Sequence, residues 1–101
     1  MKPDKVLSML GIAAKSGNIK SGEFSTESAL KDGQARLVIV AEDASDNTKK
    51  KFRDMCEYRH VPYAVYALKE TLGHCIGKGF RASVAVTDEG IAKAIRKHLE
   101  N

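Results

Sequence analysis

Apolar residues follow two different periods along this chain. Spacings of three and four, or short polar stretches closed by glycine, predict helices over residues 3–17, 23–33, 43–60, 68–78 and 88–100. Apolar runs too short for helices predict strands over residues 35–41, 62–67 and 81–87, and the connector 17–22 holds at most a very short strand.

Local signals support these boundaries. Asp4 and Asp88 have the side chain that caps a helix start, Gly33 ends the second helix, and Val61-Pro62 breaks the third. The run LVIV lacks alternation, which predicts a strand that is covered on both faces. The buried stripe of the third helix is predicted to be Phe52, Met55 and Cys56.

This order of elements predicts an α/β fold: a three-layer α/β/α sandwich with helices on both sides of a small mixed central sheet. A length of 101 residues favours one domain, 1–101, and no linker, internal repeat or low-complexity segment divides it.

Composition excludes several classes. The longest apolar runs are too short to cross a bilayer, and no long apolar region follows the first charged residues, so we expect a cytoplasmic protein without a membrane partner. Cys56 and Cys75 are 19 positions apart, and the three histidines are scattered. Neither spacing is typical of a metal site, so we expect no metal and two reduced thiols.

The stretch AEDASDNTKKK has acids and then three lysines directly after a strand. Glu42 and Asp43 could form a catalytic carboxylate pair, but no nucleophile or histidine lies at a diagnostic spacing. The competing interpretation is that Asp43, Ser45 or Asp46 caps the third helix. The second interpretation is favoured, and we predict that the protein is not an enzyme.

The lysines carry the more informative charge. The net charge is +4, and Lys49, Lys50 and Lys51 lie in the first turns of a helix, where positive charge opposes the helix dipole. The run is either a solvated surface or a contact for an anionic partner.

Two glycine-containing loops have a similar character. IKSGEFST contains the start of the second helix, whose first N–H groups can attract phosphate. IGKGFRAS contains Phe80 and Arg81; Phe80 either stacks on nucleic-acid bases or enters the core with the next strand. Neither loop matches a dinucleotide or P-loop fingerprint, and we expect no cofactor.

Five stretches in order, LGIAAKSGNIKSG, ARLVIVAEDASDNTKKKF, VPY, LGHCIGK and SVAVTDEGIAKAI, resemble the kink-turn RNA-binding ribosomal-protein superfamily of the L-seven-Ae and L-thirty-e type. Within it, the small bacterial YlxQ-like members are the most similar. The resemblance covers nearly the full length. It implies the ribosomal L-thirty-e-like sandwich and binding to a sharply bent RNA internal loop.

The resemblance also implies a site. Gly22 matches the family glycine of the loop SGEFSTES, but Phe24, Ser25 and Ser28 stand where the family pattern has Asn, Glu and Lys. Lys49 matches a position beside the RNA, and the loop with Phe80 and Arg81 matches the one that closes over a flipped-out nucleotide. The complete set of expected RNA-binding residues is Lys20, Gly22, Glu23, Phe24, Ser25, Ser28, Lys49, Phe80 and Arg81.

Two functions remain open. The first is a small, monomeric, non-enzymatic protein that binds a kink-turn or a related structured ribosomal RNA. The second is a protein-interaction module that kept the fold and lost specific RNA recognition, because the amide, carboxylate and cation of the family pattern are absent.

Overall fold

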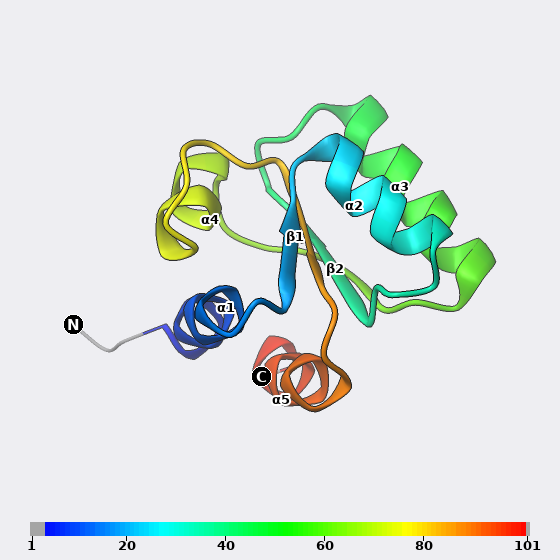
Figure 1. Ribbon diagram of the computed structural model, residues 1–101. Helices are drawn as coiled ribbons and strands as arrows, with labels where there is room; N and C mark the ends of the chain where they lie inside the picture. Colours follow the sequence, from blue (N-terminus) through cyan, green and yellow to red (C-terminus); the bar gives the residue numbers. More distant parts are fainter. Residues whose placement is uncertain (1–3, 101) are drawn as a thin grey trace.

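A four-stranded mixed sheet lies between two layers of helices (Figure 1). The computed structural model describes residues 4–100. The strands are β1 (Ile19–Ser21), β2 (Leu37–Val40), β3 (Tyr63–Val65) and β4 (Ser83–Val86). The helices are α1 (Lys5–Lys15), α2 (Glu23–Lys31), α3 (Asp46–Arg59), α4 (Lys69–Cys75) and α5 (Glu89–Leu99).

The strand order is β1-β4-β2-β3. β4 is antiparallel to both β1 and β2, with Ser21 opposite Val84 and Val40 opposite Ser83, whereas β2 and β3 are parallel. Every residue of β2 and β4 is buried, as the unbroken apolar run of β2 predicts for a strand covered on both faces. The two edge strands have three residues each and are partly exposed.

The helices divide between the two faces of the sheet. α2 and α3 pack on one face, while α1 and α5 pack on the other, and α4 lies against α1 (Figure 1). The expected three-layer α/β/α sandwich is therefore confirmed. Within the described part of the chain, no helix combines the length and the apolar character that a membrane span requires.

Three helix starts are capped as their sequences suggest. The side chains of Asp4, Ser45 and Asp88 accept hydrogen bonds from the N–H groups of Leu7, Thr48 and Ile91. Each cap satisfies a donor that has no partner inside its helix. The predicted first helix included Pro3, which lies outside the described residues.

Most elements are shorter than predicted, and the largest differences are at the end of the fourth helix, Cys75 instead of residue 78, and at the start of the third. The third helix begins at Asp46 rather than at Asp43, because Ser45 is the residue whose hydroxyl caps it. Residues 42–44 form a turn outside the helix. The Glu42 N–H donates to the carbonyl of Ala67 at 2.7 Å. Phe52 and Cys56 are buried as predicted, while Met55 is only half-buried.

Candidate nucleic-acid interface

The residues expected to bind RNA come from three neighbouring strand ends. β1 leads into Gly22 and α2, β2 leads toward Lys49 of α3, and β4 follows Phe80 and Arg81. Because β4 lies between β1 and β2 and is antiparallel to both, the carboxyl ends of β1 and β2 and the amino end of β4 lie at the same end of the sheet. We call this end of the sheet, together with the nine expected residues, the upper edge. α2 and α4 flank it in Figure 1.

Gly22 shapes the start of α2. Its φ of 91° and ψ of 162° form a conformation that other residues rarely adopt, and its N–H donates to the Ser83 carbonyl at 2.9 Å. Glycine offers no side chain to cap α2. Of the five helices in residues 4–100, α2 is the one for which the structure shows no side-chain acceptor on a first-turn N–H group. These N–H groups are available for an anion.

A buried hydroxyl pair fixes α2 on the sheet behind the upper edge. Ser83 donates from Oγ to Oγ1 of Thr26 at 3.2 Å, and both residues are fully buried. A buried polar group without a partner is costly, so this bond favours one position of the first turn of α2 on β4. Sequence reasoning missed the pair, although Thr26 lies within the predicted loop and helix.

Four expected residues line one hollow beside α2. Lys20, Phe24, Ser25 and Ser28 surround a volume of about 220 Å³, together with Ala29, Asp32 and Gln34. The Phe24 side chain is 83% exposed and packs into no core. Beside the carboxylate of Asp32, the hollow has a cation, two hydroxyls and an unburied ring, which are groups that contact phosphates, sugars and bases.

The loop with Phe80 and Arg81 reaches the upper edge from the other side. Arg81 donates from Nε to Oγ of Ser21 at 3.2 Å and from Nη1 to the Phe80 carbonyl at 2.9 Å. Phe80 is 67% exposed, which excludes the interpretation as a core aromatic. The residue Ser21, which joins this loop to β1, was missed by sequence reasoning.

This loop packs directly on α4 through a glycine. A Cβ on Gly73 would lie 1.5 Å from the carbonyl oxygen of Gly79. The Gly73 carbonyl accepts the N–H of Lys78 at 2.8 Å, and the backbone N–H of Arg81 donates to the Lys69 carbonyl at 3.1 Å. Gly73 therefore sets the position of the loop, which is a role that the motif LGHCIGK did not reveal.

The three lysines of α3 have three different surroundings. Lys49 donates from Nζ to the carbonyl of Glu42 at 2.7 Å, so its charge stays at the carboxyl end of β2. Lys50 pairs with Asp54 on the same helix at 2.8 Å. Lys49 is thus the member of the run whose ammonium contacts no carboxylate in the described residues, and the run is not a uniform cationic patch.

Lys51 instead joins α3 to α2. Its ammonium contacts the carboxylates of Glu27 and Glu23, and the Glu23 contact is 3.3 Å. The hydrogen bond to Glu27 raises the pKa of Lys51, and the same bond lowers the pKa of Glu27. The carboxylate of Glu23, which was expected to bind RNA, therefore also faces a cation of its own chain.

The acids after β2 serve neighbouring helices. Asp43 accepts the N–H of Lys69 at the start of α4 at 2.8 Å, while Ser45 caps α3. In residues 4–100, histidine, cysteine and acidic side chains do not gather in threes as a metal site requires. Cys56 and Cys75 are free thiols, and burial raises the pKa of Cys56 to about 12, which keeps it protonated.

The fold and the upper edge define a small α/β sandwich protein with cationic and aromatic side chains at one end of its sheet. Residues 4–96 match the family described as "Ribosomal protein L7Ae/L30e/S12e/Gadd45 family". The chain belongs to this family, which is non-enzymatic.

Two bacterial relatives carry the name RNA-binding protein YlxQ. The Bacillus subtilis (strain 168) protein is 41% identical over 92 residues, which cover 91% of this chain and 92% of that protein. The Enterococcus faecium protein is 33% identical over 96 residues, which cover 95% and 92%. The expected similarity to YlxQ-like members is confirmed.

Solved structures agree with the fold. A Bacillus halodurans protein of unknown function has a TM-score of 0.94 and 34% identity, with 98% of this chain and 100% of that chain covered. The Giardia lamblia 15.5kD RNA binding protein has a TM-score of 0.80 and 20% identity, with 99% and 89% covered, and it supports the fold alone.

Proposed function

We propose that this protein binds structured RNA through the upper edge, and that the preferred RNA is a kink-turn or a related ribosomal element. It would act in the cytoplasm as a monomer. The names of the two bacterial relatives support RNA as the ligand. The observation that carries the proposal is the meeting of the uncapped start of α2, the exposed Phe24 and the Phe80–Arg81 loop at one sheet edge.

The side chains of the upper edge have different roles in this proposal. Lys20, Lys49 and Arg81 bind phosphates, together with the free N–H groups of α2. Phe24 and Phe80 stack on unpaired bases. Ser25 and Ser28 hydrogen-bond base edges or sugars through hydroxyls, which both donate and accept. Arg81 is already oriented by its bonds to Ser21 and to the Phe80 carbonyl, so its ordering on binding costs less entropy.

The first experiment is a salt titration of binding to a kink-turn RNA, with a duplex of equal length as the control. We expect tighter binding to the kink-turn that persists at moderate salt. Equal and strongly salt-dependent binding to both RNAs would contradict shape recognition.

Variants then locate the site. Lys20→Gln should lower the salt slope by about 0.9 and the affinity at 0.1 M salt by about eightfold, because it removes one phosphate contact. Lys93→Gln on α5 is exposed and removes the same charge outside the upper edge, so it serves as the matched control. A similar change in both variants would remove Lys20 from the site.

The aromatic residues have a separate readout. Phe80→Ala should weaken kink-turn binding by about 5–150-fold at every salt concentration, because a stacked base contributes about 1–3 kcal/mol. Ile12→Ala truncates another exposed apolar side chain, 60% exposed on α1, and should leave affinity unchanged. Equal affinities for the two variants would argue against stacking on Phe80.

The second candidate function is a protein-interaction module. It is favoured by Phe24, an exposed apolar ring in the place of the family's Asn. A partner that stays bound after complete RNA digestion, and is released by Phe24→Ser, would support this function.

A further inference from the structure

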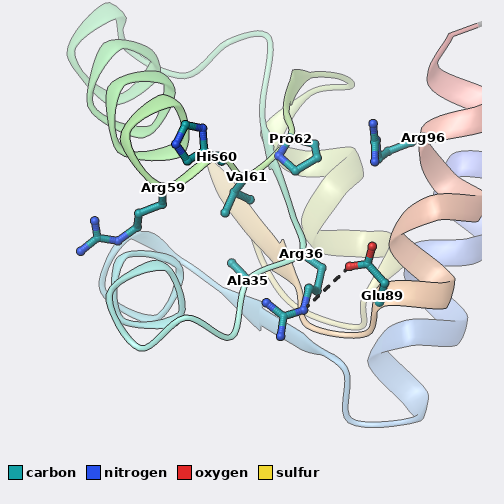
Figure 2. Close-up of a pocket in the computed structure, with 8 residues that line it drawn as sticks. All are labelled: Ala35, Arg36, Arg59, His60, Val61, Pro62, Glu89 and Arg96. Carbon is teal, nitrogen blue, oxygen red and sulfur yellow. Dashed lines mark ion pairs between the residues drawn. The ribbon is translucent and has the colours of Figure 1, made fainter.

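A second cationic hollow lies at the opposite end of the sheet from the upper edge. It is formed where β2 and β3 begin and where α3 ends, and α5 closes one side. The hollow has a volume of about 500 Å³, within the usual range for ligand sites. Its lining residues are Ala35, Arg36, Arg59, His60, Val61, Pro62, Glu89 and Arg96 (Figure 2).

Three arginines line this hollow. Figure 2 shows Arg59 on the α3 side, Arg96 on the α5 side and Arg36 between them. The acid in the lining is Glu89, which meets Arg36 at a long 3.8 Å in an exposed pair. Exposed pairs of this kind are weak, so an incoming phosphate can replace Glu89 as the partner of Arg36. The lining therefore has an excess of positive charge.

Two of the arginines are already oriented by the protein backbone. Arg59 donates from Nε to the carbonyl of Leu30 at 3.0 Å, and Arg36 donates from Nη1 to the carbonyl of Gly33 at 2.9 Å. A guanidinium has five N–H donors, so each keeps donors for a ligand. Pre-oriented arginines lose less entropy on binding, and their planar fork matches phosphate oxygens.

The hollow continues in both directions. A neighbouring hollow of about 350 Å³ shares Arg36 and Arg59 with it and extends to Lys31. Another of about 360 Å³ shares Pro62 and Arg96 with it and extends along β3. We call the three together the lower groove. Its arginines are spread along its length instead of converging on one point, which fits a ligand with several phosphates (Figure 2).

The floor of the lower groove suits a base and a ribose. Ala35 is buried, and Val61 and Pro62 are half-buried apolar residues in the lining. His60 ends α3 with a left-handed φ of 58°, and it is exposed. Histidine rings are among the side chains on which unpaired bases stack.

We propose that the lower groove binds a single-stranded nucleic-acid segment, with Arg36, Arg59 and Arg96 on successive phosphodiesters and His60 against a base. The segment is distinct from the RNA at the upper edge, because the two surfaces lie at opposite ends of the strands. The protein thereby holds two RNA segments at once. The lower-groove contact does not require the upper edge to bind a kink-turn.

The test uses an oligouridylate of eight nucleotides and the isotope-labelled full chain. Amide resonances of residues 33–36, 59–61 and 89–96 should shift on titration, and should still shift when a kink-turn RNA is present in excess. Inorganic phosphate and uridine monophosphate are the small probes. If either shifts these resonances with the same affinity, the groove is a site for small phosphates and the strand proposal is overturned.

Variants of the lower groove test the proposal through their affinity for the oligouridylate. Arg36→Gln combined with Arg96→Gln should weaken oligouridylate binding at 0.1 M salt by about 25-fold and lower the salt slope by about 1.4, since two phosphate contacts are lost. Lys5→Gln combined with Lys15→Gln removes the same charge from exposed positions on α1, which do not line the lower groove. It should weaken binding by less than about threefold, because distant surface charges are screened. Equal losses in both pairs would overturn the proposal.

His60→Asn completes the design, because asparagine tolerates a left-handed φ. It should weaken oligouridylate binding by at least about fivefold while the salt slope stays unchanged, as expected for a lost stack. Kink-turn affinity should be unchanged in all groove variants. A failure of kink-turn binding alone would therefore count against the upper-edge function, whereas silent groove resonances would count against this proposal.

Discussion

Gly73 offers the sharpest test of how the upper edge is built. Gly73→Ala would place a methyl group 1.5 Å from the carbonyl oxygen of Gly79 and 2.5 Å from its carbonyl carbon. Real Cβ contacts are essentially never below 3.0 Å, so the backbone of one segment has to move. A change of side-chain rotamer cannot relieve a clash between a Cβ and a backbone carbonyl.

The expected cost follows from what the movement disturbs. Overpacking of this kind costs about 1–3 kcal/mol. The loop is also held by the bonds Lys78 N–H to Gly73 O and Arg81 N–H to Lys69 O, each worth about 1 kcal/mol. If the movement breaks one of these two bonds, the total loss in the free energy of unfolding is about 2–4 kcal/mol. For a domain of this size the melting temperature would fall by about 10–25 °C.

Gly79→Ala is the matched control. It adds the same methyl group on the loop side of this contact, where the structure shows no atom within 4 Å and no left-handed φ. This variant should be as stable as the parent, or slightly more so, because alanine restricts the unfolded chain. Thermal and urea unfolding, followed by circular dichroism, compare the three proteins.

The displacement of the loop should also weaken RNA binding. Gly73→Ala moves the segment that carries Phe80 and Arg81, so kink-turn affinity should fall even at a temperature where the variant is fully folded. Gly79→Ala should keep its affinity. Melting temperatures within about 2 °C of each other for the two variants would refute the close approach of the loop to α4.

Two more predictions concern the packing of α2. Thr26→Val leaves the buried Ser83 hydroxyl without its partner and should cost about 1–3 kcal/mol in urea unfolding, while adding Ser83→Ala should recover part of the loss; strict additivity would contradict the pairing. The hydrogen bond from Lys51 holds the pKa of Glu27 below its ordinary 4.5, so its contribution to stability is complete above that value and is lost as the pH falls through the lower, folded pKa. Glu27→Gln should therefore reduce the loss of stability on acidification between about pH 6 and pH 3, and an unchanged profile would exclude this pair as a cause.

The fold could be predicted because its signals are local. The unbroken run of β2, the caps Asp4 and Asp88, and the glycine after α2 each depend on a few neighbouring residues. The start of α3 was misplaced because Asp43, Ser45 and Asp46 all have capping side chains. The choice among them depends on α4, whose first N–H takes Asp43 as its acceptor.

The upper edge could be predicted only in part. The topology places these loops together, because they follow or precede strand ends at the same end of the sheet. The family pattern pointed to the same loops. The partners of individual side chains were not predictable, because they join distant segments. Lys51 meets Glu23 across 28 positions, and Arg81 meets Ser21 across 60. Such contacts follow from how helices and strands pack, which no local spacing shows.

The position of β4 in the strand order has a consequence for synthesis on the ribosome. β4 is the last strand of the chain, yet it lies between β1 and β2 and supplies their hydrogen bonds. A nascent chain that has not yet emerged past Val86 can pair β2 with β3 alone, and closing the long loops to β1 carries an entropic cost. Until β4 has emerged, neither the upper edge nor the opposite end of the four-stranded sheet can form. The upper edge, and with it the proposed RNA binding, can therefore form only after the residues up to Val86 have been translated.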